Sequence, residues 1–146
     1  MKKELVDKVN VYLANLALFY IKLHNLHWHV TGVQFKAVHE YLEELYNETT
    51  EKLDEIAELL KKEGETPLSS LKEYLEKGTI KELDSSSRCV KEALITVLED
   101  YKTFKNEALL IRKSANEDDE FPLVNTLEEH IEGYNKIIWF ISSMLK

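Results

Sequence analysis

Glycine and proline are scarce in this chain of 146 residues, which contains four of the first and two of the second. Sheet proteins with many tight turns need more of both, so the scarcity favours long helices. The single cysteine, Cys89, excludes an intrachain disulfide framework and suits a reducing compartment. No hydrophobic run approaches the ~20 residues that cross a membrane, and Met1 is followed by charged residues instead of the apolar segment of a signal peptide. We therefore expect a cytoplasmic helical protein with no membrane partner.

Basic residues are fewer than acidic residues in this chain. The chain has 19 lysines and arginines against 27 aspartates and glutamates, which gives a formal net charge of −8. Because clustered lysine and arginine drive binding to phosphates, this balance argues against a strong nucleic-acid surface, and it is compatible with the attraction of cations. Hydrophobic residues make up 44% of the chain, enough for a true core, and the length suits one domain over 1–146.

Four long segments carry hydrophobic residues at intervals of three and four, the spacing that places them on one face of a helix. In the first segment, Leu5, Val9 and Leu13 show the pattern. Gly64 follows the second segment, where a glycine that caps the end of a helix is expected. We predict helices over about Lys3–Val30, Phe35–Glu63, Ser87–Asn116 and Leu123–Leu145.

The connections between these helices differ in length. Thr31–Gly32 interrupts the first pattern and makes a short turn. A crossover of about Glu65–Ser86 is long for a bundle, and it contains a short helix that Ser69 or Ser70 can cap and that Gly78 ends. Short first and last connections with a long middle one describe an all-α, ferritin-like four-helix bundle with a short extra helix in the crossover.

A polar stripe runs along the second predicted helix. His39 and Glu43 are four residues apart, and so are Asp54 and Glu58, so each pair shares a helix face. Eleven residues separate Glu43 from Asp54, which at about 100° per residue brings both pairs onto the same face. That face is rotated by one residue, about 100°, from the hydrophobic stripe. The polar stripe therefore flanks the core.

Distance prevents one chain from gathering both pairs around one site. Glu43 and Asp54 are separated by about 16 Å of helix rise, whereas paired metal ions lie about 3.5–4 Å apart. A second, antiparallel copy could complete the site. A two-fold axis near residues 48–50 would bring Asp54 and Glu58 of one chain against His39 and Glu43 of the other, at two identical sites.

His27 can join the same site. It lies near the end of the first predicted helix, and the Thr31–Gly32 turn folds this end against the start of the second helix, where His39 lies. Mixed imidazole and carboxylate ligands suit iron, manganese or zinc. A solvated polar face is the alternative explanation of the same spacing, and the residues by themselves leave both open.

The segment His24–Glu58 contains a specific arrangement. A His-Trp pair, a histidine twelve residues on, an acid four residues after that and the element DEIAE follow one another in it. This arrangement resembles that of the Dps family, the mini-ferritins of bacteria and archaea. The resemblance extends more weakly over the whole chain, and it includes the short helix in the crossover and the sequence IIWF at Ile137–Phe140.

The resemblance implies a hollow homododecamer that oxidises Fe(II), preferentially with hydrogen peroxide, and stores the ferric product inside. It also implies a ferroxidase centre for two iron ions at the dimer interface. Glu43 stands where many members have aspartate, which implies a shifted geometry and not a lost site. Trp28 would be an aromatic neighbour of the centre or would pack in the interface. The implied ligands are His27, His39, Glu43, Asp54 and Glu58.

Other acids receive weaker assignments. A second stripe on the second helix could line the cavity and nucleate ferric mineral, or it could be a solvated face; it consists of Glu40, Glu44, Glu48, Glu51 and Glu55. The family builds iron-entry pores from the loop before the last helix, where Asn116–Pro122 departs from the usual Gly-Asp pattern. Leu59, where the family often has arginine, and Glu63–Glu65, where it has Gly-Gly, are further departures. The candidate pore acids are Asp118, Asp119 and Glu120.

The remaining histidines and two further residues are given structural roles. We expect His24 and His29 to pack or form hydrogen bonds, and His130, which has no partner at ligand spacing, to lie on the surface. Cys89 is expected in the core. Gly133 lies inside the last helix, where glycine costs up to ~1 kcal/mol against alanine, so we expect close backbone packing there.

The sequence argues against two other functions. A DNA-binding, nucleoid-protecting protein with little ferroxidase activity is the alternative within the family, but only Lys2 and Lys3 precede the first helix, so DNA binding is unlikely at a net charge of −8. A ferritin with its metals inside one bundle needs Glu-x-x-His motifs. None of the five histidines has glutamate three residues before it, and this second possibility is therefore excluded.

Overall fold

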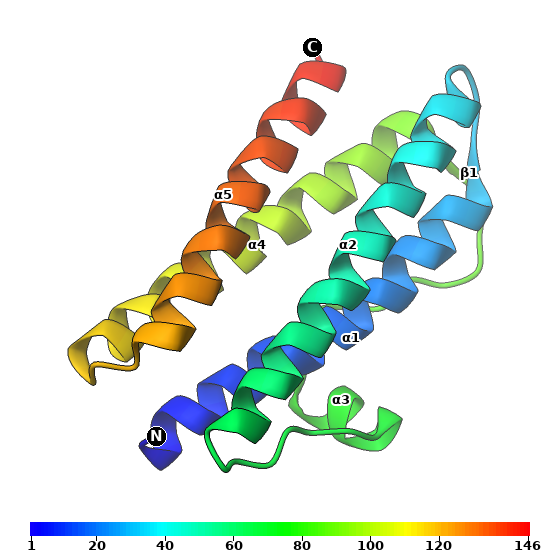
Figure 1. Ribbon diagram of the computed structural model, residues 1–146. Helices are drawn as coiled ribbons and strands as arrows, with labels where there is room; N and C mark the ends of the chain where they lie inside the picture. The colour runs from blue at the N-terminus through cyan, green and yellow to red at the C-terminus, as the bar shows by residue number, and fades with distance from the viewer.

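The computed structural model describes all 146 residues, and Figure 1 shows four long helices that pack as two antiparallel pairs. Lys3–His29 packs against Phe35–Lys62 in one pair, and Val90–Glu117 packs against Phe121–Met144 in the other. A short helix lies in the crossover between the pairs. The predicted ferritin-like bundle with its extra helix is confirmed. The elements are α1 (Lys3–His29), β1 (Val30–Thr31), α2 (Phe35–Lys62), α3 (Leu71–Lys77), β2 (Arg88–Cys89), α4 (Val90–Glu117) and α5 (Phe121–Met144).

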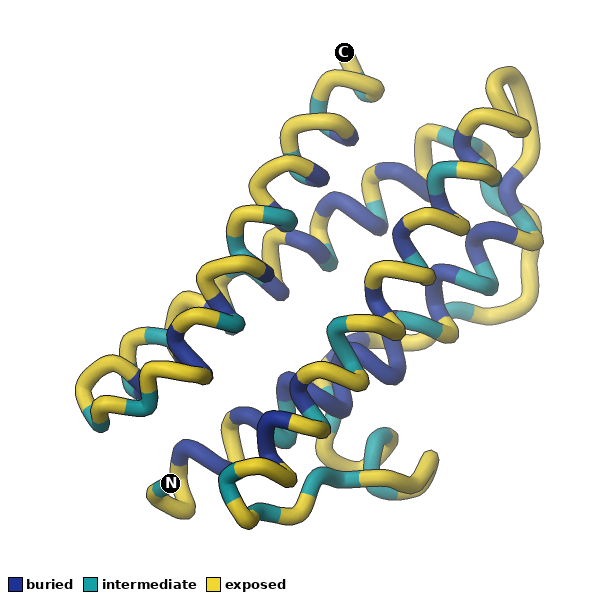
Figure 2. The backbone as a smooth tube through the Cα atoms, in the orientation of Figure 1, coloured by how far each residue is buried: buried dark blue, intermediate teal, exposed yellow.

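One hydrophobic core fills the space between the two pairs. The buried faces of the long helices are turned toward one another in Figure 2, and the exposed faces point outward. Tyr12, Phe19, Phe104 and Tyr134 are among the largest fully buried side chains. Each large buried side chain contributes about 1.5–3 kcal/mol, so this core is the main source of stability.

Two of the long helices end in the same hydrogen-bonded motif. At the end of α2, Gly64 has a φ of 79°, and the amide of Glu65 donates to the carbonyl of Leu60. At the end of α4, Asp119 has a φ of 58°, and the amide of Glu120 donates to the carbonyl of Ala115. Both are Schellman motifs, in which the left-handed residue satisfies the last carbonyls of the helix. The expectation that Gly64 caps α2 is confirmed.

The short helix α3 is capped and packed by particular residues. The Ser70 side chain accepts a hydrogen bond from the Glu73 amide at 3.2 Å and so caps the helix, and the Glu73 carboxylate accepts from the Ser69 amide at 3.1 Å just before it. Gly78 ends the helix as predicted. A Cβ atom at Gly78 would clash with Leu18 Cδ1 on α1 and would lie 2.8 Å from the backbone carbonyl oxygen of Tyr74, so glycine is required here.

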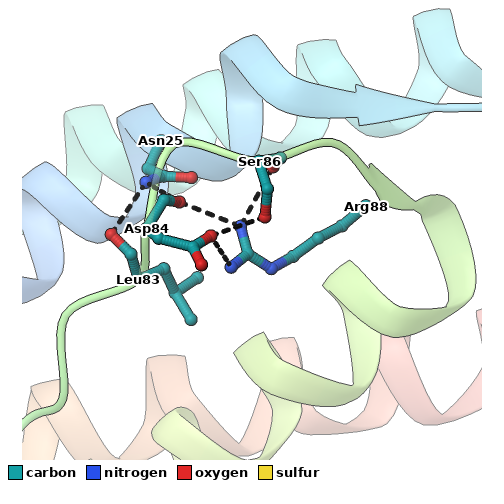
Figure 3. A network of polar contacts seen from close by, with 5 residues as sticks. All are labelled: Asn25, Leu83, Asp84, Ser86 and Arg88. Atoms are coloured by element: carbon teal, nitrogen blue, oxygen red, sulfur yellow. Dashed lines mark hydrogen bonds and ion pairs between the residues drawn. The ribbon is translucent and has the colours of Figure 1, made fainter.

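The rest of the crossover is attached to the hairpin between α1 and α2. Strands β1 and β2 pair in parallel, with Val30 opposite Arg88. Figure 3 shows the neighbouring network, in which the Asn25 amide donates to the carbonyls of Leu83 and Asp84 and the Arg88 guanidinium donates to Asp84. These contacts fix the crossover beside the end of α1. Two-residue strands carry no periodic pattern, and the sequence did not predict them.

Three expectations are corrected. Cys89 is exposed on β2 and does not lie in the core, because its strand runs along the surface of the hairpin. No heavy atom lies within 4 Å of a Cβ atom built at Gly133, so close backbone packing does not explain that glycine. The helix α4 begins at Val90 and not near Ser87, because the intervening residues pair as β2.

No helix has the length and hydrophobicity needed to span a membrane.

Candidate metal centre

His27 and His39 face each other where α1 and α2 are joined. The Nδ1 atom of His27 lies 2.6 Å from the backbone carbonyl oxygen of His39, and Nδ1 of His39 lies 2.7 Å from the carbonyl oxygen of His27. The two rings are stacked, with centroids 3.7 Å apart and an angle of 13° between their planes. The hairpin that starts at Thr31 therefore holds both imidazoles in one fixed arrangement.

These two hydrogen bonds determine which ring nitrogen carries the proton. A carbonyl oxygen only accepts, so Nδ1 of each ring must donate. In a neutral imidazole the other nitrogen then has a free lone pair. Metal-binding histidines commonly donate their second ring nitrogen to a carbonyl in this way. Both Nε2 atoms are therefore prepared to bind a metal ion.

Glu43 lies beside the histidine pair, one turn after His39 on α2. Its Oε1 is 4.0 Å from His27 Nε2. The Tyr46 hydroxyl donates to the same Oε1 at 3.2 Å and so limits the positions of the carboxylate. The Tyr46 ring stacks on His24 with centroids 3.8 Å apart. Tyr46 was missed by sequence reasoning, although its spacing of three from Glu43 on a helix was the available signal.

Asp54 and Glu58 lie farther along α2, and both are exposed. Along α2, Glu43 and Asp54 are separated by about 16 Å of helix rise. The chain contains no group of three histidine, cysteine or acidic side chains that could hold a metal ion together. His27, His39 and Glu43 lie at one end of the stripe without forming such a group, and Asp54 and Glu58 lie apart from them as a separate pair.

Trp28, His24 and Phe35 lie near the histidine pair. Trp28 is 67% exposed, and its ring contacts His24 at 5.4 Å between centroids. Nδ1 of His24 donates to the carbonyl of Tyr20 at 2.8 Å, which confirms its expected hydrogen-bonding role. Phe35 stacks on His39, with centroids 5.0 Å apart. Aromatic rings thus surround the histidine pair.

The acidic stripe on α2 is exposed along its length, and it consists of Glu40, Glu44, Glu48, Glu51 and Glu55. Tyr41 lies beside it, and burial together with the charges of Glu48 and Glu44 raises the pKa of Tyr41 to about 12. Glu55 differs from the other four, because its Oε2 lies 3.0 Å from Nε2 of His130.

His130 corrects an expectation. It is 3% exposed and does not lie on the surface, because it occupies the core face of α5 between Leu127 and Tyr134. Its two ring nitrogens contact Tyr12 and Glu55, residues of α1 and α2. The available signal was the spacing of three and four from its buried neighbours.

The candidate pore acids are placed in the loop between α4 and α5. Asp118 is paired with Lys2 at 2.7 Å, and the Glu120 carboxylate lies 3.8 Å from the N-terminal amine of Met1. Asp119 is exposed and forms no ion pair. Two of the three carboxylates are therefore engaged in ion pairs in this structure.

Comparison with known proteins gives consistent matches. The model of the ferritin-like domain family matches residues 6–146. The DNA protection during starvation protein of Brevibacillus brevis is 32% identical over 138 residues, 94% of this chain and 92% of that protein. Among solved structures, antigen TpF1 from Treponema pallidum has a TM-score of 0.96 at 32% identity and covers 98% of this chain and 92% of that one. A Dps protein from Vibrio cholerae O1, described as a member of a broad superfamily of ferritin-like diiron-carboxylate proteins, has a TM-score of 0.94 at 25% identity, over 99% of this chain and 90% of that one.

Proposed function

Because this chain belongs to the Dps family of ferritin-like proteins, we propose that it oxidises Fe(II), preferentially with hydrogen peroxide, and stores the ferric product. Iron is the substrate and the stored product. The oxidation takes place at sites for two iron ions, and the mineral forms inside a hollow homododecamer. The description of the Vibrio cholerae relative as a diiron-carboxylate protein supports iron as the metal.

The histidine pair carries this proposal. Reciprocal hydrogen bonds to backbone carbonyls leave Nε2 of His27 and of His39 as lone-pair donors before any metal arrives. A buried histidine with only a structural role needs no such arrangement on both rings. Glu43, held by Tyr46, adds a carboxylate oxygen next to His27. Imidazole and carboxylate ligands together suit iron.

A second copy of the chain completes the site. Asp54 and Glu58 lie on the same face of α2 as Glu43 but about 16 Å of helix away. In an antiparallel α2 pair, the carboxylates of one chain approach the histidines of the other, and a two-fold dimer then contains two identical centres. Trp28 is exposed beside His27 and is suited to pack in such an interface.

The acidic surface of α2 supports storage. Glu40, Glu44, Glu48 and Glu51 are exposed carboxylates without a hydrogen-bonded histidine, and we assign mineral nucleation to them. Glu55 is left out of this set because it binds His130. Asp119, the candidate pore acid without an ion pair, is assigned to iron entry.

Coating of DNA is the less favoured function. The lysines that precede and begin α1 are both engaged with acids, Lys2 with Asp118 at 2.7 Å and Lys3 with Asp7 at 2.8 Å. The net charge of −8 opposes binding to a polyanion. We expect no mobility shift of DNA at low salt and neutral pH, and tight binding in that assay would overturn this assignment.

The proposed function is tested by removing the two imidazoles. His27→Ala together with His39→Ala should greatly slow peroxide-driven Fe(II) oxidation, measured by stopped-flow absorbance on the sizing-column-purified oligomer. His29→Ala is the matched control, because His29 lies on the same helix and is not one of the proposed ligands. Unchanged kinetics in the double variant, with the oligomer intact, would sink the site assignment. A parallel series with oxygen as the oxidant tests the preference for peroxide.

A further inference from the structure

Four polar side chains form a continuous chain through the middle of the bundle. The Tyr134 hydroxyl contacts the Tyr12 hydroxyl, which lies 2.9 Å from Nδ1 of His130. Nε2 of His130 lies 3.0 Å from Oε2 of Glu55. The residues come from α5, α1 and α2, so the chain connects both helix pairs. It begins in the fully buried core and ends at a carboxylate whose side chain is 44% exposed.

The direction of these hydrogen bonds follows from Glu55, the carboxylate at the exposed end of the series. An ionised carboxylate only accepts, so Nε2 of His130 carries the hydrogen and donates to Glu55. Nδ1 of a neutral His130 is then a lone pair, and it accepts the hydroxyl proton of Tyr12. The Tyr12 oxygen in turn accepts from the Tyr134 hydroxyl. Each proton therefore points toward Glu55.

Burial opposes the ionisation of the two tyrosines. Tyr12 and Tyr134 are almost completely buried, and burial raises the pKa of both phenols far above the ordinary value. Burial also lowers the pKa of His130, against the opposing effect of Glu55, and this keeps the imidazole neutral and able to accept a proton. A phenol in this setting does not ionise alone. It can lose its proton when it also loses an electron, because no net charge then remains on the ring.

Aromatic rings surround the hydrogen-bonded side chains of Tyr12 and Tyr134. The Tyr12 ring contacts Phe104 with centroids 5.9 Å apart, and Tyr134 contacts Tyr101 at 5.7 Å. The two tryptophans, Trp28 and Trp139, are 67% and 65% exposed and are open to oxidants in solution. Trp139 follows Tyr134 on α5 by five residues, about 8 Å of helix rise, so it is the tryptophan placed to exchange an electron with these buried side chains.

We propose that Tyr12 is a proton-coupled one-electron donor, with His130 as the proton acceptor and Glu55 as the group that stabilises the product. One electron leaves the Tyr12 phenol and reduces an inorganic radical, or a tryptophan radical that such an oxidant has formed. The phenolic O–H bond breaks, and the proton forms an N–H bond at Nδ1 of His130. The products are a neutral phenoxyl radical, an imidazolium facing Glu55, and the reduced oxidant.

This activity goes beyond iron oxidation, and it does not depend on the metal centre. A protein that handles Fe(II) and peroxide is exposed to stray one-electron oxidants, and a buried donor would confine the unpaired electron to the core. Tyr74 has a phenol that donates to the carbonyl of Leu68 at 3.2 Å, and a carbonyl is not a base that takes up a proton. Tyr74 is therefore a control that the chain itself provides.

The test is pulse radiolysis of the metal-free, full-length protein in azide solution, where azidyl radicals oxidise tryptophan. In the wild type, the tryptophan-radical absorbance should decay as phenoxyl absorbance grows, and the growth should be slower in D₂O. Tyr12→Phe keeps the packing of the ring and should lose most of the phenoxyl growth. Tyr74→Phe should leave it unchanged. Full phenoxyl growth in Tyr12→Phe would overturn the proposal, and so would an equal loss in Tyr74→Phe.

Two more variants keep the proposal testable if Tyr12→Phe disturbs folding. Glu55→Gln changes only the exposed end of the chain and should slow phenoxyl growth, because a neutral amide stabilises the imidazolium less than a carboxylate does. Tyr134→Phe retains the Tyr12–His130 pair and should retain the radical. Loss of the signal in Tyr134→Phe, or an unchanged rate in Glu55→Gln, contradicts the assignment. Since no iron is present, these outcomes are independent of the ferroxidase test.

Discussion

Glu107 on α4 shows how burial can control the charge of one side chain. It is partly buried against α1, and its carboxylate accepts a hydrogen bond from the Asn15 amide at 2.9 Å. Burial, opposed by this hydrogen bond, raises the pKa of Glu107 to about 7 from its ordinary value of 4.5. No cation lies close enough to offset the loss of hydration. The carboxyl group is therefore protonated in mildly acidic solution.

The effect of pH on stability follows from this shift. Between pH 4.5 and about 7 the folded protein holds a proton on Glu107 that the unfolded chain has released. The stabilising contribution of Glu107 is thus present below pH 4.5 and is lost as the pH rises to 7. We expect Glu107→Gln, which stays neutral and can still accept from Asn15, to be more stable than the wild type at pH 8 but not at pH 4.5.

Urea unfolding of both proteins at the two pH values measures this difference. His130 has a lowered pKa and changes stability in the opposite direction with pH, but it is present in both proteins and cancels in the comparison. An equal difference between the two proteins at both pH values would contradict the role given to Glu107.

Two helices of this fold end at a glycine, and glycine is required for a different reason at each. At Gly78 the backbone has an ordinary negative φ, and the requirement is space: an added Cβ would meet Leu18, and it would also lie 2.8 Å from the carbonyl oxygen of Tyr74. At Gly64 there is space, and the requirement is the positive φ of 79°. The same residue type therefore serves packing at the end of α3 and backbone conformation at the end of α2.

The packing requirement predicts a loss of stability. Gly78→Ala should destabilise the protein by about 1–3 kcal/mol, the usual range for overpacking, because the Tyr74 carbonyl belongs to the backbone and cannot turn aside. Gly133→Ala is the matched control, since its Cβ meets no atom within 4 Å. That change should instead stabilise α5 by about 0.5–1 kcal/mol. Chemical denaturation of both variants measures the change in the free energy of unfolding, which should be a loss for Gly78→Ala and a gain for Gly133→Ala. Equal changes in the two variants would contradict the packing argument.

The two Schellman motifs give a second prediction. Asp119 occupies in α4 the left-handed position that Gly64 occupies in α2. A left-handed residue other than glycine is strained by roughly 1–2 kcal/mol, less for aspartate. Asp119→Gly should therefore raise the stability by up to about 1 kcal/mol, and Gly64→Ala should lower it. Thermal unfolding checks both, and a lower midpoint for Asp119→Gly would show that the carboxylate has a stabilising contact in the assembled protein.

The sequence predicted the elements that have a repeating pattern, and it failed where no pattern exists. The four long helices and α3 follow from hydrophobic spacing and capping residues. The β1–β2 pair was missed because Val30 and Arg88 meet only through tertiary contacts. His130 was misplaced because its partners, Tyr12 and Glu55, are distant in sequence. The reciprocal bonds of His27 and His39 also depend on the exact path of the turn, which spacing along a helix does not contain.

In the whole molecule, the separation of the proposed ligands into two groups is the feature on which the proposed function depends most. His27, His39 and Glu43 lie at one end of the α2 stripe, and Asp54 and Glu58 lie toward the other. We propose that two chains share each centre, so the two groups of one chain belong to two different centres. This arrangement makes a prediction that no centre confined to one chain would share.

Two inactive variants should restore activity when they are mixed. One carries His27→Ala and His39→Ala, and the other carries Asp54→Asn and Glu58→Gln. A dimer with one chain of each contains one intact centre and one centre that lacks all four groups. Co-assembled oligomers should therefore oxidise Fe(II) faster than either variant alone, as measured by stopped-flow absorbance. Activity no greater than that of the parent variants, in oligomers shown by mass spectrometry to be mixed, would contradict a shared centre.

The unbroken course of α2 from Phe35 to Lys62 also limits how this protein can change during evolution. Inserting or deleting one residue between Glu43 and Asp54 would turn the following part of the helix by about 100°. Both centres of a dimer would then be lost in a single event, although every ligand would still be encoded. An insertion of seven residues nearly restores the face but lengthens the separation by about 10 Å. We therefore expect length variation among functional descendants in the loops and the crossover, and a constant number of residues between these two acids.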